Sequence, residues 1–238
     1  MDRGSHSEVK YPFVCLSGLP RSGSTLLSSI LSENPLIHAE GNSAVCQLMW
    51  DMQESCEINS REQLLASSRF ELQHNLISSI PDIYYGYVDK PIVLDKCRSW
   101  TIPSNMQMLR QYITNSPKVI VMTRPIQDII ESFKSLYASN DKPFQESVFR
   151  KKGSEPLMRS CDGVDFAKKN NTGEFLFIDY DDLVFDTNKE LERIYSFLEM
   201  DIYKHDLQNI VNSYPENDLV YGLVGMHTVR NTISRRGL

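Results

Sequence analysis

The segment between Tyr11 and Leu31 constrains the fold of this chain more than any other. It contains an apolar run at residues 13–16, a loop that begins at Gly18 and includes Gly23, and an apolar-periodic stretch that continues to Leu31. A strand, a glycine-containing loop and a helix in this order form a phosphate cradle. Backbone N–H groups at the start of the helix, together with the helix dipole, attract an anion. The segment therefore predicts an anion-binding loop in an α/β domain.

This loop departs from the nucleotide-binding motif G-x-x-x-x-G-K-[ST] at one position. Gly18 and Gly23 have the spacing of that motif, but Ser24 stands where its lysine belongs. Arg21 supplies a cation inside the loop, and the hydroxyls of Ser24 and Thr25 are expected to cap the helix. No magnesium-binding acid is evident after a later strand, so a kinase or NTPase is the weaker alternative. A plain strand-to-helix turn is the alternative without function.

Apolar runs that suit strands alternate with helix-like segments along the chain. This alternation predicts an α/β three-layer sandwich, with a central and mainly parallel sheet flanked by helices. Ligands of such sheets bind at the carboxyl ends of the strands, where Gly18, Lys96, Arg124 and Tyr180 are expected. Strands are predicted near 12–17, 91–95, 118–123 and 174–179, and helices near 24–33, 43–56, 61–80, 103–115, 126–138 and 187–199.

A second candidate site follows the strand predicted at 118–123. Arg124 stands at the carboxyl end of this strand, and Pro125 suits the first turn of the helix that comes next. Ser132 lies eight residues after Arg124 on that helix. A guanidinium group can grip phosphate oxygens through its planar fork, and a serine hydroxyl can add a donor.

The string P-R-S-G-S-T-L-L, residues 20–27, resembles the 5′-phosphosulfate loop of sulfotransferases that use 3′-phosphoadenosine 5′-phosphosulfate (PAPS). The spacing of Arg124 and Ser132 resembles the pair that holds the 3′-phosphate in that family, and the segment from Tyr180 to Leu183 resembles its Y-[ED]-D-L motif. The resemblance spans roughly residues 11–200 and implies a P-loop NTPase-like fold. Its motif order is closest to the tyrosylprotein and carbohydrate branch. The donor-binding residues that it implies are Gly18, Pro20, Arg21, Ser22, Gly23, Ser24, Thr25, Arg124, Ser132 and Tyr180, with Arg230 and Arg235 from the basic C-terminal segment.

The resemblance also implies a metal-independent, in-line transfer of the sulfuryl group to an acceptor hydroxyl of a peptide, sugar or small molecule. Lys96 is expected to stabilise the oxygen of the departing 3′-phosphoadenosine 5′-phosphate, with Arg21 holding phosphosulfate oxygens. Glu40 lies within one position of the acid found in the protein-tyrosine branch, and we expect it to be the base. His38 is the second choice for this role and Asp95 the third. A non-catalytic binder of phosphorylated or sulfated ligands remains a further alternative.

Composition sets broader limits. The chain has 238 residues, of which 41% are hydrophobic, and this suits one domain from residue 11 to 238. Residues 1–10 are polar and are expected to be a disordered start or residues added in cloning. A net charge of −6 argues against a nucleic-acid partner, and the scattered cysteines and histidines predict no metal site. No apolar run approaches the ~20 residues of a transmembrane helix, and no signal peptide is evident. These features predict a cytoplasmic protein or a soluble form of a secretory-pathway enzyme.

Overall fold

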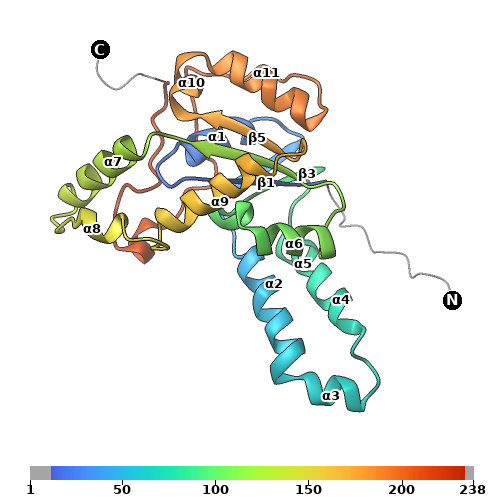
Figure 1. Ribbon diagram of the computed structural model, residues 1–238. Helices are drawn as coiled ribbons and strands as arrows, with labels where there is room; N and C mark the ends of the chain where they lie inside the picture. Colours follow the sequence, from blue (N-terminus) through green and yellow to red (C-terminus); the bar gives the residue numbers. More distant parts are fainter. Residues whose placement is uncertain (1–11, 234–238) are drawn as a thin grey trace.

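A five-stranded parallel sheet forms the centre of the computed structural model, which describes residues 12–233. The strand order is β2-β3-β1-β4-β5, so the first loop follows the middle strand, β1 (Figure 1). All four strand pairings are parallel, as the alternation of strands and helices predicts. The strands are β1 (Phe13–Gly18), β2 (Ile37–Asn42), β3 (Ile92–Lys96), β4 (Lys118–Thr123) and β5 (Phe175–Asp179).

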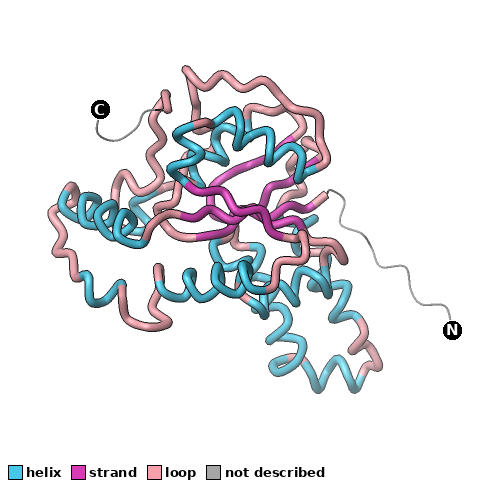
Figure 2. Tube along the Cα trace, turned by 45° about the horizontal axis from the view of Figure 1, so that its top comes forward, coloured by secondary structure: helices cyan, strands magenta, loops and turns pink. Residues whose placement is uncertain are grey.

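Helices cover both faces of this sheet. In β4, Val119 and Val121 pack into one apolar cluster while Ile120 and Met122 pack into the other, because successive side chains of a strand point to opposite faces. Helices α1 (Ser24–Ser32) and α11 (Thr187–Leu198) supply the second cluster. The first is supplied by α2 (Val45–Glu54), α6 (Pro103–Tyr112), α7 (Ile126–Ala138) and α9 (Met158–Lys169), on the opposite side of the strands (Figures 1 and 2). The three-layer prediction is therefore confirmed.

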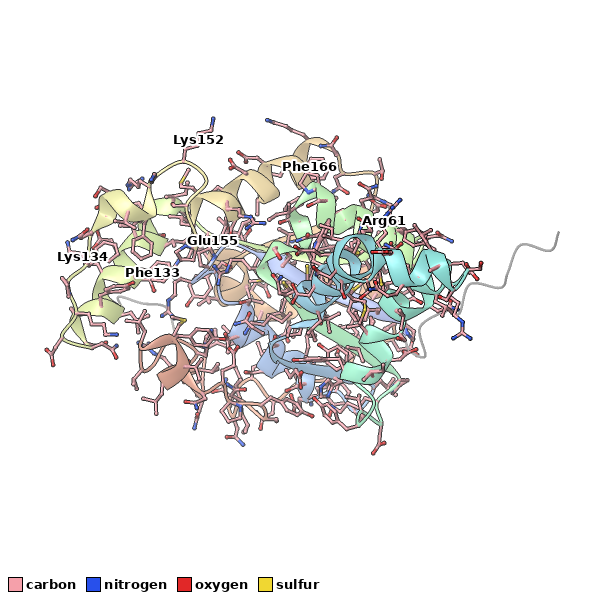
Figure 3. All side chains as sticks on the ribbon, turned by 90° about the horizontal axis from the view of Figure 1, so that it is seen from below. Arg61, Phe133, Lys134, Lys152, Glu155 and Phe166 are labelled. Atoms are coloured by element: carbon pink, nitrogen blue, oxygen red, sulfur yellow. The ribbon has the colours of Figure 1, made fainter. Side chains whose placement is uncertain are left out.

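The chain between β2 and β3 leaves the sheet as a helical arm (Figure 1). The sequence predicts one helix over 61–80, but the structure has two short helices within this segment and a third that begins at Ile80. Ser68, between the first two, has a left-handed φ of 54° that a helix does not contain, and Pro81 lies in the first turn of the third. Arg61 marks the near end of the arm when the molecule is viewed from below (Figure 3). The arm contains α2, the π-helix Ser55–Asn59, α3 (Arg61–Ala66), α4 (Leu72–Ser78) and α5 (Ile80–Tyr84).

Strand β2 is absent from the sequence prediction. Its six residues, IHAEGN, have little β-propensity after Ile37, and tertiary pairing with β3 decides their conformation. The remaining elements are short: the 3₁₀ helix η2 (Arg98–Thr101), α8 (Glu146–Phe149), α10 (Tyr180–Phe185) and the 3₁₀ helix η3 (Asp218–Tyr221). Within residues 12–233, no helix has the length and apolarity needed to cross a membrane.

The segment after α11 folds back over the domain. It packs on the α1 side of the sheet through Ile210, whose N–H donates to the Asn231 carbonyl over 2.7 Å. From there residues 226–230 reach the carboxyl ends of the central strands, where they line the same cavity as the first loop. This return places residues from both ends of the chain in one site.

Candidate functional site

The loop between β1 and α1 requires glycine at both of its ends. Gly18 has a φ of 124°, and a Cβ there would lie 2.1 Å from the Met122 carbonyl oxygen. Gly23 has a φ of 88°, and a Cβ there would lie 2.5 Å from the ring of Tyr180. The Leu19 N–H donates to the Met122 carbonyl over 2.9 Å, which ties the loop to the end of β4. Any other residue at these two positions would displace the loop from the strands.

The predicted caps of α1 are wrong in detail. Gly23 is the N-cap residue, and no side chain caps the helix, because Ser24 and Thr25 already occupy its first two positions. The Thr25 hydroxyl instead accepts a hydrogen bond from Lys96 Nζ over 3.2 Å. Ser22 is fully buried, and its hydroxyl donates to the Leu19 carbonyl rather than toward the cavity. Pro125 is likewise the N-cap of α7 rather than part of its first turn.

Lys96 is a buried cation at the carboxyl end of β3. It is 3% exposed, and its Nζ lies 3.3 Å from Glu216 Oε2. Burial lowers the pKa of Lys96, because desolvation penalises the charged ammonium, and the carboxylate of Glu216 partly opposes this effect. A partly desolvated ammonium in this place can stabilise negative charge that develops on a nearby oxygen.

Glu216 connects Lys96 to a group of polar side chains that the sequence analysis missed. Its Oε2 lies 3.1 Å from His227 Nε2, and His227 Nδ1 lies 2.6 Å from Asp218 Oδ1. The other oxygen of Glu216 accepts hydrogen bonds from the backbone and side chain of Asn42, over 2.6 and 2.8 Å. Burial lowers the pKa of His227, whereas the two carboxylates act to raise it. Glu216, Asp218 and His227 form the C-terminal triad, and no local motif in residues 214–230 indicates it.

Arg124 forms the centre of a second group at the carboxyl end of β4. Its guanidinium carbon lies 4.4 Å from the centre of the Tyr180 ring, and one NH group donates to the Arg21 carbonyl over 3.0 Å. Arg124 Nε is buried and has no hydrogen-bond partner among the described residues. Arg21 Nε donates to the Ser132 hydroxyl over 3.1 Å, and another of its nitrogens contacts the Met226 carbonyl. The structure thus brings Arg21, Arg124, Ser132 and Tyr180 together.

Lys96 and His227 of the first group and Arg21, Arg124, Ser132 and Tyr180 of the second line one cavity of about 230 Å³ above the strand ends. Ser22 does not line it, and Arg235 lies outside the described residues. The cavity also receives residues that were not predicted, among them Asn42, Arg98 and His227. Of the predicted site residues, those that line it are Gly18, Pro20, Arg21, Gly23, Ser24, Thr25, Lys96, Arg124, Ser132, Tyr180 and Arg230.

The three residues considered as bases lie outside this cavity lining. The Glu40 carboxylate accepts hydrogen bonds from Tyr87 over 2.6 Å and pairs with His38 Nε2 over 3.1 Å. Burial acts to raise the pKa of Glu40, but these two partners outweigh it and lower the pKa. Asp95 is fully buried and accepts hydrogen bonds from Tyr85 and Trp100. His38 is 3% exposed and packs against aromatic rings.

A second cavity of about 270 Å³ adjoins the first. Asn42 and Arg98 line both cavities, and Cys97, the residue after Lys96, lines the second. The second cavity also receives Glu155, which lies between Phe133 and Phe166 in the view from below (Figure 3). Its other lining residues are Ser43, Cys97, Ser99, Ile102, Ser160 and Tyr221. Among residues 12–233, no group of three or more acidic, histidine or cysteine side chains is arranged to hold a metal ion.

The sequence of this chain matches a known protein family. Residues 12–204 match the sulfotransferase family, a stretch that includes the loop, Lys96, Arg124 and Tyr180 but ends before the C-terminal triad. No match to a curated protein was found.

Solved structures of sulfotransferases share the fold. The sulfotransferase domain of the Synechococcus PCC 7002 olefin synthase is 18% identical, with a TM-score of 0.60 over 96% of this chain and 91% of that domain. A sulfotransferase from Alicyclobacillus acidocaldarius is 14% identical, with a TM-score of 0.57 over 89% of each chain. The sulfotransferase domain of the curacin biosynthetic pathway is 18% identical, with a TM-score of 0.56 over 96% of this chain and 89% of that domain. At these identities the likeness shows the fold alone.

Proposed function

We propose that this chain, which belongs to the sulfotransferase family, transfers the sulfuryl group of PAPS to the hydroxyl of a peptide tyrosine or a carbohydrate. One observation supports this proposal most strongly: Lys96, Arg21 and Arg124 reach a single cavity over the glycine loop from three different segments. Three cations around such a loop suit a donor with a phosphosulfate at one end and a 3′-phosphate at the other.

The residues present fit the 3′-phosphate at the Arg124 end. Arg124 Nε is a buried donor without a partner, a costly state that an anionic acceptor would relieve. The Ser132 hydroxyl accepts from Arg21 and keeps its own proton available for a phosphate oxygen. Arg124, Arg21 and Ser132 would therefore hold this phosphate. The ring of Tyr180 fixes the guanidinium plane from one side.

The loop and Lys96 suit the other end of the donor. When bound, PAPS supplies an activated sulfuryl group whose transfer leaves negative charge on the bridging phosphate oxygen. Lys96 would stabilise this charge, and the N–H groups at the start of α1 would bind the 5′-phosphate oxygens. Glu216 contacts Lys96 in the free protein, so donor binding has to overcome this ion pair.

The second cavity is the proposed acceptor site, because it meets the donor cavity at Asn42 and Arg98. An acceptor there needs a base for its hydroxyl proton. Glu40 remains one candidate, although Tyr87 and His38 occupy its carboxylate. His227 is the second candidate, because it lines the donor cavity and its Nε2 lies 3.5 Å from the side-chain nitrogen of Asn42. His227 lines the donor cavity and Glu40 does not, which favours His227, and the His227 Nε2 would have to leave Glu216, 3.1 Å away, to act as the base.

Variants of these two residues distinguish the candidates. His227→Gln should lower turnover on the order of 100-fold or more if His227 is the base, and Glu40→Gln should then have little effect. Because burial lowers the His227 pKa, turnover of the unmodified protein should fall only as the pH drops below about 6.5. This acidic limb should vanish in His227→Gln. A large loss in Glu40→Gln with normal turnover in His227→Gln would return the role to Glu40.

The function itself is tested with radiolabelled PAPS in EDTA and a panel of tyrosine peptides, oligosaccharides and phenols. We expect label to move to at least one acceptor class while 3′-phosphoadenosine 5′-phosphate accumulates. Calorimetry in the same buffer should show binding of 3′-phosphoadenosine 5′-phosphate, with magnesium ATP as the comparison. Binding of magnesium ATP alone would contradict the proposal and favour a kinase or NTPase. Donor binding without transfer to any acceptor would favour a non-catalytic binder.

A further inference from the structure

Two cysteines meet directly beside Lys96. Cys97 follows Lys96 in the chain, and its N–H donates to the Leu16 carbonyl over 3.0 Å, which fixes it at the end of β3. Cys46 is the second residue of α2. The Ser43 N–H donates to the Lys96 carbonyl over 2.9 Å and holds the start of this helix against the same strand end. Backbone hydrogen bonds therefore set the relative position of the two thiols.

Both sulfur atoms contact one serine. The Ser99 hydroxyl lies 3.2 Å from Cys97 Sγ and 3.8 Å from Cys46 Sγ, so the two thiols meet at one hydroxyl group. Their exposure differs, since Cys46 is 4% exposed whereas Cys97 is half-buried and lines the second cavity. A small oxidant in this cavity therefore reaches Cys97, whereas the buried Cys46 does not line the cavity.

The neighbouring groups shift the pKa values of the two thiols in opposite directions. The neighbouring Cys46 thiol lowers the pKa of Cys97; burial opposes this effect, and Ser99 adds to it. The Cys97 thiol and burial raise the pKa of Cys46, so Cys46 keeps its proton. Asp95, the charged group behind both thiols, acts to raise both pKa values and does not reverse this order. Cys97 is the better nucleophile, because the thiolate is the reactive form.

We propose that Cys97 and Cys46 form a peroxide-sensitive thiol pair that controls access to the acceptor cavity. The Cys97 thiolate attacks the hydroxyl oxygen of a hydroperoxide and the O–O bond breaks, which leaves a Cys97 sulfenic acid. The departing hydroxide or alkoxide takes a proton from solvent, where the Cys97 thiol released its own, and becomes water or an alcohol. The Cys46 sulfur then attacks the sulfenic sulfur, its proton joins the departing hydroxyl, and a disulfide and one water form. Two thiols are oxidised by two electrons, and one hydroperoxide is reduced.

This disulfide would connect α2 to the residue after Lys96. It would replace a half-buried thiol of the second cavity with a rigid cross-link and restrain the strand end that carries Lys96. We expect acceptor turnover to fall when it forms. This consequence rests on the proposed sulfotransfer, whereas the thiol chemistry stands without it.

The thiol chemistry is tested on the full chain with hydrogen peroxide, followed by thiol alkylation and peptide mass spectrometry. The expected product is a peptide pair joined through Cys46 and Cys97 that dithiothreitol separates. In Cys46→Ser, Cys97 should instead accumulate as a sulfenic acid that dimedone traps. Cys161 is the matched control, because it is also half-buried but burial raises its pKa. It should oxidise on the order of tenfold more slowly than Cys97.

Two results would contradict the proposal that Cys97 and Cys46 react as a thiol pair. One is oxidation of Cys161 as fast as that of Cys97. The other is irreversible oxidation of Cys97 to a sulfinic acid while Cys46 is present and stays reduced.

The control of access is tested separately by PAPS turnover. Turnover should fall about tenfold or more on oxidation of the unmodified protein and return with dithiothreitol. Cys46→Ser cannot form this disulfide, so oxidation of this variant should not cause the fall in PAPS turnover that depends on the disulfide. A disulfide that forms without loss of turnover would overturn the control of access, and no turnover in the reduced protein would count against the sulfotransfer proposal instead.

Discussion

The carboxyl ends of β3 and β4 carry the two central cations of the cavity in different electrostatic settings. At the end of β3, Lys96 already contacts a carboxylate, that of Glu216 at 3.3 Å. At the end of β4, Arg124 has a carbonyl and an aromatic ring as partners, and no carboxylate of residues 12–233 lies within ion-pair distance of it. Lys96 thus has an ion-pair partner within the protein, whereas Arg124 has none among the described residues.

This difference suggests a division of labour along the donor. The Arg124 end would contribute affinity, because it offers an unsatisfied buried donor to the 3′-phosphate. The Lys96 end would contribute to catalysis, because its cation is desolvated and interacts most strongly with the leaving oxygen when negative charge develops there in the transition state. The C-terminal triad adds a cost to donor binding at this end, since Glu216 holds the same ammonium group.

The largest expected effect belongs to Lys96→Met. Methionine retains most of the side-chain volume but removes the ammonium, so we expect turnover of PAPS to fall about 100- to 1,000-fold. Donor affinity should change much less, because charge on the leaving oxygen is greatest in the transition state. The measurement is steady-state kinetics with radiolabelled PAPS beside calorimetry with 3′-phosphoadenosine 5′-phosphate. Lys118→Met, at a half-exposed lysine outside the cavity, is the control.

A loss of affinity as large as the loss of turnover would break the proposed division, since Lys96 would then be a binding residue like Arg124.

Glu216→Gln should have the opposite sign. Removal of the carboxylate relieves its competition with the donor for Lys96, so affinity for 3′-phosphoadenosine 5′-phosphate at neutral pH should rise about tenfold. Glu216 also raises the Lys96 pKa, so in the variant the ammonium should lose its proton at a lower pH. As the pH is raised into the alkaline range, donor binding should therefore begin to weaken at a lower pH in the variant than in the unmodified protein.

Calorimetric titrations across this pH range measure both effects. Glu174→Gln removes an ion pair with Arg110 outside the cavity and should change neither. Unchanged or weaker donor binding in Glu216→Gln at neutral pH would show that the carboxylate supports Lys96 instead of competing with the donor.

The smallest effect is expected for Ser132→Ala. Loss of one hydroxyl donor at the 3′-phosphate should weaken binding of 3′-phosphoadenosine 5′-phosphate about fivefold, close to the worth of one hydrogen bond. Ser135→Ala, on the exposed side of the same helix, is the matched control. Equal effects of the two variants on affinity would remove Ser132 from the 3′-phosphate site.

Local motifs account for the part of this site that the sequence predicts. Gly18, Gly23 and Thr25 belong to one strand–loop–helix unit, and Arg124 and Ser132 to another, so short spacings and strand ends suffice to place them. The Lys96–Glu216 contact joins residues 120 positions apart and depends on the path of the tail across the domain.

Tertiary contacts also determine the parts of the fold that the sequence does not predict. Strand β2 owes its conformation to its pairing with β3 rather than to its own composition, and this leaves Glu40 on an edge strand with Tyr87 and His38 as partners. The C-terminal triad has no periodicity or motif, so only the folded chain shows that His227 lines the cavity.

The most direct test of the division compares PAPS with adenosine 5′-phosphosulfate, which differs from it only by the absence of the 3′-phosphate, as ligands of Arg124→Gln. The account predicts that this substitution weakens PAPS binding about 10- to 100-fold, the worth of hydrogen bonds to a charged group, and leaves adenosine 5′-phosphosulfate binding nearly unchanged. Equal losses for the two ligands would contradict it, because Arg124 would then contact a part of the donor that both ligands share.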